Sequence, residues 1–237
     1  MYLFYTPDIS GNSYQLNEEE SKHCVRVLRL AVGDEVHLTD GRGTLYTTRI
    51  TVAQPKACRV EVVRQEKNVG QRPYFLHLAV SPTKNMERYE WLLEKITEIG
   101  VDIITPILCD HSERRILKQE RAEKIVISAM KQSLKTTLPE LHELTAVKQL
   151  ISQPFIGEKF ICHCAEGERL LLPKALADCS KALILIGPEG DFSPEEITLA
   201  LQHGFKAVSL GDTRLRVETA ALVACTYMQS AQLLVKS

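Results

Sequence analysis

The apolar positions from residue 74 onward alternate between short continuous runs and stretches with helical spacing. The runs predict buried strands, because both faces of a parallel strand are covered. The helical stretches begin and end at good capping residues, such as Asn85 before one helix and Gly100 after it. The predicted order is strand 74–80, helix 85–99, strand 103–108, helix 119–134, strand 160–164 and strand 182–186. This alternation predicts an α/β fold with a mostly parallel sheet.

The stretch 182–224 has the clearest pattern in the chain. Its apolar run Ala182–Ile186 stops at the tetrapeptide Gly187-Pro188-Glu189-Gly190. A helix then starts with a capping box formed by Ser193 and Glu196, and continues to about Gln202 before Gly204. This part of the sequence therefore predicts a strand, a glycine-containing loop and a helix, in that order.

A second unit of the same kind follows directly. The short strand Ala207–Leu210 ends in the loop Gly211–Arg216, and a last helix starts at about Glu218. Ligands of open α/β sheets bind beyond the carboxyl ends of the strands. We therefore expect the loops 187–190 and 211–216 to contact one ligand.

The first 68 residues predict a different, β-rich domain with one helix. Asn17 caps a helix that extends to about Leu30, and the turn 40–43 joins two strands. The predicted strands are 35–39, 45–52 and 57–63. The polar segment 65–73 is the best candidate for a linker, which gives two domains, 1–68 and 74–237.

Composition and charge limit the classes of protein. The chain has 237 residues, 44% of them hydrophobic, and a net charge of −1. The first 70 residues carry nine basic and nine acidic side chains, which leaves 20 of the 29 basic and 21 of the 30 acidic ones for the remainder. Bulk charge therefore gives no support to nucleic-acid binding, and any such site must be a local patch. The sequence carries no evident secretory signal or membrane span, and its seven scattered cysteines are typical of reduced thiols in a cytoplasmic protein.

The two glycine loops have no phosphate-binding motif. Neither GxxxxGK[ST] nor GxGxxG follows a strand, so nucleoside triphosphates and dinucleotides are disfavoured. The motifs IGPEGDFS and SLGDTRLRVETA instead resemble those of the SPOUT superfamily, in its branch of small-subunit ribosomal RNA uridine-N3 methyltransferases. The pattern HxxRVLRLxVGDEV…DGRG is similar to the PUA-like domain of the same family. Two positions depart from the family forms GPEGGFS and LRTETA, namely Asp191 and Val217.

The resemblance implies a fold and an activity. It implies a C-terminal SPOUT domain with a deep trefoil knot, after an N-terminal PUA-like RNA-binding β-barrel. The implied reaction is methylation of N3 of a uridine in 16S ribosomal RNA by S-adenosylmethionine, in a homodimer and without a metal. Three alternatives remain: a catalytically silent RNA-binding protein, a SPOUT enzyme for another base or RNA, and a dinucleotide-dependent enzyme, which the missing fingerprint disfavours.

The resemblance also implies site residues. Arg216 is the first catalytic candidate, because a guanidinium can stabilise a developing uracil anion. Glu218 could accept the N3 proton, although a role at the helix N-terminus is favoured for it. The implied cofactor contacts are Ile186, Gly187, Pro188, Glu189, Gly190, Leu210, Gly211, Arg214, Leu215 and Arg216.

Basic residues supply the candidate RNA contacts. Lys22, Arg26 and Arg29 have the spacing of one helical stripe, for which a solvated helix face is the alternative. The full set implied by the resemblance is Lys22, His23, Arg26, Arg29, Arg42, Lys84, Arg114 and Arg115.

The remaining residues with chemical potential have simpler interpretations. Cys162, His163 and Cys164 offer too few ligands for a zinc site, so structural cysteines are favoured. The other histidines without a motif are interpreted as surface or packing residues: His111, His142 and His203.

Overall fold

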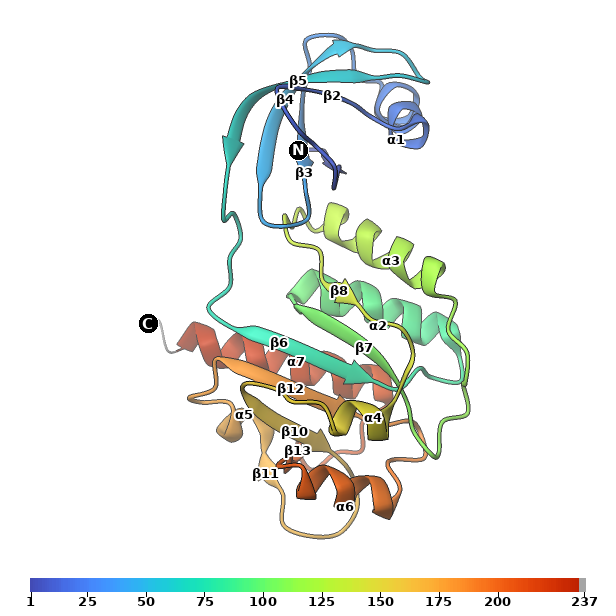
Figure 1. Ribbon diagram of the computed structural model, residues 1–237, viewed down its shortest axis with the longest axis vertical. Helices are drawn as coiled ribbons and strands as arrows, with labels where there is room; N and C mark the ends of the chain where they lie inside the picture. The colour runs from blue at the N-terminus through green and yellow to red at the C-terminus, as the bar shows by residue number, and fades with distance from the viewer. Residues whose placement is uncertain (235–237) are drawn as a thin grey trace. The chain divides into compact units, whose positions relative to one another are not determined.

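The computed structural model describes residues 1–234, with side chains as far as residue 231, and the chain forms two compact units (Figure 1). The first unit contains residues 1–71 and 127–138, and the second contains residues 72–126 and the chain from 139 onward. Residues 235–237, with which the predicted second domain ends, lie outside the described residues. The sequence pattern gave no sign that residues 127–138 belong with the N-terminal unit.

The first unit is built on a five-stranded sheet with the order β1-β3-β4-β5-β2. Strands β3, β4 and β5 form an antiparallel meander, whereas β1 pairs with β3 in parallel. Their bounds are β1 Leu3–Tyr5, β2 Ser13–Gln15, β3 Glu35–Thr39, β4 Leu45–Val52 and β5 Arg59–Glu66. Phe4, Leu38 and Ile50 are among the buried side chains of its core. The predicted meander is confirmed, with β5 starting and ending later than expected.

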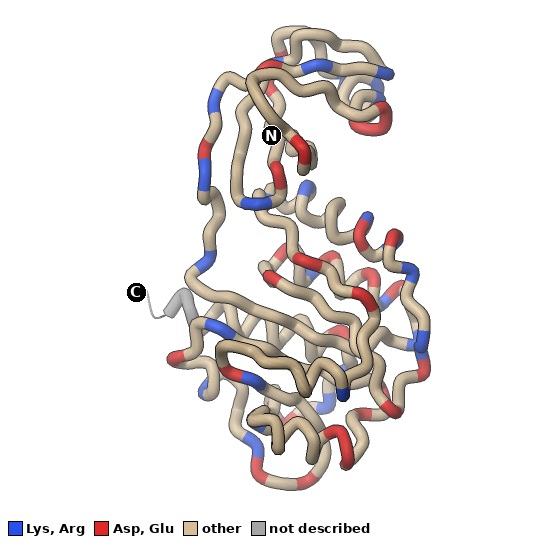
Figure 2. Tube along the Cα trace, viewed as in Figure 1, with Lys and Arg blue, Asp and Glu red and all other residues tan. Residues whose placement is uncertain are grey.

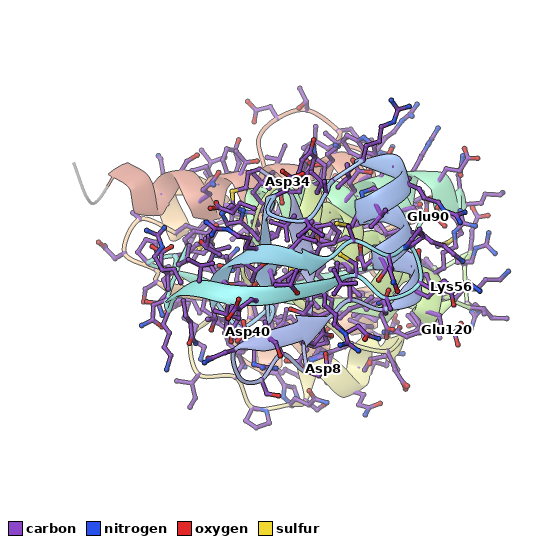
Figure 3. All side chains as sticks on the ribbon, turned by 90° about the horizontal axis from the view of Figure 1, so that it is seen from above. Asp8, Asp34, Asp40, Lys56, Glu90 and Glu120 are labelled. Atoms are coloured by element: carbon purple, nitrogen blue, oxygen red, sulfur yellow. The ribbon has the colours of Figure 1, made fainter. Side chains whose placement is uncertain are left out.

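The predicted turn between β3 and β4 is also confirmed. The carboxylate of Asp40, labelled in Figure 3, accepts the backbone N–H groups of Arg42 at 2.8 Å and Thr44 at 3.1 Å. Gly41 has a φ of 73°, a conformation that glycine adopts without strain. Gly43 has a φ of 92°, and the N–H of Gly41 donates to Thr39 Oγ1 at 3.1 Å, so side-chain hydrogen bonds and two glycines together stabilise the turn.

The geometry of the N-terminal helix shows that the predicted stripe of basic residues was partly wrong. Helix α1, Glu18–Lys22, starts at Asn17 as predicted, but it continues as a π-helix, η1, His23–Val27. The N–H of Leu28 donates to the carbonyl of His23, five residues earlier, which widens the turn. Arg29 follows the helix with a φ of 57°. The helical spacing used to align Arg29 with Lys22 does not apply, so Arg29 does not extend a stripe on that helix.

Residues 127–138 are joined to the first unit by backbone hydrogen bonds. The carbonyl of Thr136 accepts the N–H of Gly43 at 2.9 Å, and the N–H of Leu138 donates to the carbonyl of Gly41 at 2.8 Å. Helix α3, Gln119–Gln132, begins in the second unit and ends in the first. The second half of a helix that the sequence assigned to one domain thus belongs to the other unit.

The second unit is built on an eight-stranded sheet in which every pairing of described strands is parallel. The order is β11-β13-β10-β12-β6-β7-β8, and β9 also pairs with β7. The bounds are β6 Phe75–Val80, β7 Ile103–Leu108, β8 Glu140–Leu141, β9 Thr145–Ala146, β10 Glu158–Cys162, β11 Leu170–Leu171, β12 Lys181–Ile186 and β13 Lys206–Ser209. The predicted parallel sheet is confirmed.

Helices cover both faces of this sheet (Figure 1). On one face, α4, Val147–Ile151, and α6, Pro194–Gln202, pack over side chains that include Leu183 and Leu185. On the other face lie α2, Met86–Ile99, and α7, Val217–Leu234, which pack against each other. Because β12 is covered on both sides, all five of its residues after Lys181 are buried, and its sequence is continuously apolar. The short helix α5, Leu172–Ala175, contacts α7.

The capping residues of these helices are confirmed. The N–H of Glu196 donates to Ser193 Oγ at 3.2 Å, and the N–H of Ser193 donates to the Glu196 carboxylate at 2.9 Å. Asn85 accepts the N–H of Glu87 at 2.9 Å, and Gly100 ends α2 with a φ of 129°. The starts of α2 and α6 are thus determined by local sequence.

Some elements differ from the sequence predictions. Strand β10 lies two residues earlier than expected, so His163 and Cys164 fall in the loop after it. The two-residue strands β8, β9 and β11 were not predicted, because so short a segment shows no periodicity. None of the described helices is long and apolar enough to cross a membrane. The knot stays a prediction of the family resemblance.

Candidate active site

The loops at the carboxyl ends of five parallel strands meet at one edge of the second unit's sheet. They follow β6, β7, β10, β12 and β13 and consist of residues 81–85, 109–118, 163–169, 187–193 and 210–216. Parallel strands place their carboxyl ends on the same side, which is where ligands of such sheets bind. Both predicted cofactor loops are in this set.

The glycines of the loop after β12 fit closely against protein. A Cβ added to Gly187 would lie 3.0 Å from the Phe192 ring, and one added to Gly190 would lie 3.0 Å from Cβ of His111. Either contact is tighter than ordinary van der Waals packing. The packing of the loop thus favours glycine at both positions, a reason that is independent of any ligand.

Glu189 links this loop to the one after β6. Its carboxylate accepts the backbone N–H of Lys84 at 3.0 Å, although the two residues are 105 positions apart in sequence. Arg114, from the loop after β7, donates to the carbonyl of Lys84 at 3.2 Å. One backbone segment, 84–85, is therefore held from two neighbouring loops.

Asp191 links the loop after β12 to the loop after β10. It has a φ of 62°, and its carboxylate accepts the N–H of Cys164 at 2.7 Å and the N–H of Phe192 at 2.8 Å. His111 Nδ1 lies 3.0 Å from the carbonyl oxygen of Gly190 and 3.1 Å from that of Asp191. Because carbonyl oxygens only accept, Nδ1 carries the proton of that imidazole. Sequence interpretation gave His111 no role in this loop, and no motif in the sequence signals one.

The buried carboxylate of Glu196 accepts backbone hydrogen bonds at the same edge of the sheet. Glu196 is fully buried and accepts the N–H groups of Asp110 at 2.8 Å and of Ser193 at 2.9 Å. Ser193 Oγ donates to the Asp110 carboxylate at 2.8 Å, and Lys148 Nζ approaches it to 2.9 Å. The hydrogen bond from Lys148 lowers the pKa of Asp110. The capping box of α6 is thus part of a network that fixes the loop after β7.

The loop after β13 is more open. Gly211 has a φ of 129° and no described atom within 4 Å of an added Cβ, so its backbone conformation alone favours glycine. The Tyr227 hydroxyl donates to the Leu210 carbonyl at 3.4 Å. Arg214 and Arg216 are exposed, and the guanidinium of Arg216 makes no hydrogen bond or ion pair with the residues that the structure describes. Its own carbonyl accepts the N–H of Ala220 at the start of α7.

Glu218 differs from Arg216 in its surroundings. It lies in the first turn of α7, and its side chain is only 12% exposed. Nε of Arg88, from the first turn of α2, lies 3.9 Å from its carboxylate. The positive N-terminal end of α7 and Arg88 both favour a negative charge at this position. Sequence interpretation missed Arg88, whose partner lies 130 residues away.

The predicted RNA contacts fall in both units. In the first unit, His23, Arg26 and Arg29 are exposed, Lys22 forms an ion pair with Glu18 at 2.7 Å, and Arg42 lies 3.7 Å from Asp40. In the second unit, Lys84 pairs with Glu113 at 2.8 Å, which raises the pKa of Lys84, and Arg115 is exposed. Several of these cations therefore have an acidic neighbour, and Lys and Arg alternate with Asp and Glu over both units (Figure 2).

His163 is the buried histidine of this edge. It is 8% exposed, and neither ring nitrogen has a hydrogen-bond partner among the described residues. Burial lowers its pKa, because desolvation disfavours the imidazolium ion. No group of three or more His, Cys, Asp or Glu side chains that could hold a metal ion occurs in the described part of the chain.

Comparison with known proteins decides the family. Residues 70–229 match the family model described as an RNA methyltransferase domain, and residues 16–63 match an RNA methyltransferase PUA domain. A ribosomal RNA small subunit methyltransferase E from Aquifex aeolicus is 31% identical over 228 residues, covering 94% of this chain and 96% of that protein. The chain belongs to this RNA methyltransferase family. A second member of the family with the same name, from Buchnera aphidicola, is 27% identical and covers 96% of this chain and 92% of its own.

Solved structures of the methyltransferase family have the same fold. A probable rRNA-methyltransferase from Porphyromonas gingivalis superposes with a TM-score of 0.90 and 44% identity, covering 99% of this chain and 100% of that one. The ribosomal RNA small subunit methyltransferase E of Neisseria gonorrhoeae, bound to S-adenosyl methionine, has a TM-score of 0.88 and 28% identity, with 97% of each chain covered. The family assignment made from the two loop motifs is confirmed.

Proposed function

We propose that this protein transfers the methyl group of S-adenosylmethionine to N3 of a uridine in 16S ribosomal RNA. The observation that carries the proposal is the pair of loops after β12 and β13 at one edge of the parallel sheet, within a chain of this methyltransferase family. The N-terminal domain, 1–68, would bind RNA, and the domain 74–237 would carry out the transfer.

The residues of the two loops fit the cofactor. Glu189, Gly190 and Gly211 are exposed, so a flat, uncharged adenine can approach their backbone. The Gly190 carbonyl accepts from His111, and Ser209 Oγ bonds to both the N–H and the C=O of Gly211. In the described part of the chain, the backbone groups that remain for the adenine edge are those of Glu189 and the N–H of Gly190. The cofactor has no phosphate, which agrees with loops that lack a phosphate motif. Ile186, Pro188, Leu210 and Leu215 would supply apolar contacts, with Gly187, Arg214 and Arg216 completing the site. The bound cofactor supplies an electrophilic methyl group on its sulfonium.

Arg216 is proposed to act on the base. Uracil N3 is a poor nucleophile while protonated, so negative charge must develop on the ring and its carbonyl oxygens as the proton leaves. A guanidinium with no partner among the described side chains is free to hydrogen-bond such an oxygen. Arg216 would therefore stabilise the uracil anion and orient N3 toward the methyl group.

Glu218 is proposed as the proton acceptor. Its carboxylate is mostly shielded from water, with Arg88 on one side and the start of α7 beneath it. A carboxylate oxygen held at this position could accept the N3 proton. The same Glu218 carboxylate would serve both roles, at the N-terminus of α7 and as the base.

The RNA would be held by cations of both domains. Exposed Arg26, Arg29 and His23 are proposed to contact phosphates from the first unit, together with Lys22 and Arg42. Lys84, Arg114 and Arg115 are proposed to do so from the second unit, close to the candidate active site. A homodimer in the cytoplasm is proposed by analogy with the family, and no metal is required.

Two measurements test this proposal. Calorimetry should detect S-adenosylmethionine binding and no binding of NAD. A transfer assay with radiolabelled S-adenosylmethionine should then label 16S ribosomal RNA and leave transfer RNA unlabelled. Binding of NAD in place of S-adenosylmethionine, or label in transfer RNA alone, would contradict the proposed cofactor or substrate.

A further inference from the structure

Asp191 adopts a backbone conformation that residues other than glycine rarely take. Its φ is 62°, the left-handed region, and it is one of four non-glycine residues with a positive φ in the described chain. Aspartate is tolerated there when its short side chain makes hydrogen bonds nearby. The contacts of that side chain are therefore the reason the conformation persists.

One of those contacts is local and the other is not. The bond from the Phe192 N–H to Oδ1 is between neighbours and is ordinary turn chemistry. The bond from the Cys164 N–H to Oδ2 joins residues 27 positions apart and crosses from one loop to another. A turn would need only the first bond, so the second one has the separate effect of joining the loops after β10 and β12.

The joined loops belong to the candidate cofactor site. Strand β10 pairs with both β12 and β13, so the loop after β10 lies between the two glycine loops. On the other side, His111 donates from Nδ1 to the carbonyls of Gly190 and Asp191. Residues 190–191 are thus held on one side through their carbonyls by the loop after β7, and on the other through the Asp191 carboxylate by the loop after β10.

We propose that Asp191 is a positioning residue for the cofactor: it holds the loop after β10 against the loop 187–190 in the conformation that binds S-adenosylmethionine. This inference rests on the proposed function, because it concerns the same cofactor. Asp191 acts through the backbone of Cys164 and is given no contact with the reacting atoms. Its role is to keep the site formed before the cofactor arrives, which reduces the ordering needed on binding.

The test compares three variants. Asp191→Gly keeps the backbone conformation without strain and removes both side-chain bonds. Asp191→Asn keeps one side-chain oxygen at the same place and should restore part of the effect. Asn68→Gly is the matched control, because Asn68 is exposed, has a φ of 59° and lies in the first unit.

We expect Asp191→Gly to weaken S-adenosylmethionine binding about ten-fold in calorimetry, the effect of losing one charge-assisted hydrogen bond. KM for the cofactor should rise while kcat stays within about two-fold, because the loss is in binding. Hydrogen exchange of the Cys164 amide should become faster in the unliganded variant. Asp191→Asn should lie between wild type and Asp191→Gly, and Asn68→Gly should match wild type in all three measurements.

The outcomes separate the two proposals. An Asp191→Gly variant that binds the cofactor as tightly as wild type, or whose Cys164 amide exchanges no faster, overturns the positioning role and leaves the proposed function intact. A loss of kcat with unchanged KM also overturns it, because a positioning residue of the cofactor loops acts on binding. Failure of the wild-type protein to bind S-adenosylmethionine overturns the proposed function itself.

Discussion

Arg216 and Glu218 are two residues apart but have opposite surroundings, and this contrast supports different roles for them. Arg216 ends an open loop, is exposed and has no partner among the described residues. Glu218 has entered the first turn of α7, is 12% exposed and lies 3.9 Å from Arg88. An exposed, unpaired cation suits contact with a substrate that arrives from solvent, whereas a shielded carboxylate suits proton transfer.

Replacing Arg216 tests the first role. Arg216→Ala should lower kcat about 100-fold, the usual effect of losing a donor that stabilises a developing anion. Arg216→Lys should recover part of the rate because it keeps the charge but not the planar donor pair. Methyl transfer under saturating cofactor is the measurement, with exposed Lys174→Ala on α5 as the control. An Arg216→Ala enzyme with wild-type turnover would remove Arg216 from the reaction.

Replacing Glu218 by its amide tests the second role. Glu218→Gln has nearly the same shape and cannot accept the proton, so kcat should fall by a factor of roughly 100 or more. The exposed first-turn residue Glu195 of α6 supplies the control Glu195→Gln. If Glu218→Gln keeps its activity and loses only stability, the carboxylate serves the helix alone.

At the scale of elements, local sequence predicts helix starts well and helix geometry less well. The capping box at Ser193 and Glu196 is present, because both of its bonds are made within four residues. The change from α1 to the π-helix η1 was not predicted, since the spacing of apolar residues does not signal a switch to bonds between residues five positions apart. Strand β10 was displaced by two residues, and β5 starts two and ends three residues later than predicted, because apolar runs do not mark where pairing stops.

A prediction at this scale concerns Ser193, the N-cap residue of α6. Ser193→Ala should lower the free energy of unfolding by about 1–2 kcal/mol, since it removes the cap and the bond from Ser193 Oγ to Asp110. Urea unfolding followed by the fluorescence of Trp91, the single tryptophan, measures this in the second unit. Thr198→Ala, on an exposed face of the same helix, should change stability much less. Equal effects of the two changes would contradict the capping account.

Across the whole molecule, the sequence predicted the sheet, the order of the main elements and the family. It did not predict that residues 127–138 join the first unit, because those contacts connect residues about a hundred positions apart. They include the backbone bonds of Thr136 and Leu138 and the ion pair of Lys131 with Glu20 at 2.6 Å. At the candidate site, the glycine loops were found through their motifs. Asp191 was noted in the sequence as a departure from the family motif, but its contact with Cys164 became visible only in the structure. The contacts of His111 and Arg88 did so as well, because each involves a residue far away in sequence.

Because His77 is buried, we expect the stability of the second unit to depend on pH. Burial, with repulsion from His142, lowers the pKa of His77 from 6.5 to about 4. Between pH 6.5 and about 4, His77 is protonated in the unfolded chain but neutral in the folded one. The free energy of unfolding therefore falls as the pH drops through this range. Between pH 7 and 5 the loss from this residue is about 2 kcal/mol.

His77→Gln should remove this part of the pH dependence, because glutamine does not titrate. Urea unfolding at pH 7 and pH 5, monitored by Trp91, gives the difference between the variant and wild type. The exposed His203→Gln variant should keep the wild-type dependence. A His77→Gln protein with an unchanged pH profile would show that His77 is protonated equally in both states.

The central claim is that the protein methylates N3 of a uridine in small-subunit ribosomal RNA. Its most direct test is mass spectrometry of nucleosides from 16S ribosomal RNA incubated with the enzyme and S-adenosylmethionine carrying a deuterated methyl group. The account predicts labelled N3-methyluridine with the wild-type enzyme and a large loss with Arg216→Ala. Label in any other nucleoside, or no label in RNA that the wild-type enzyme binds, would contradict it.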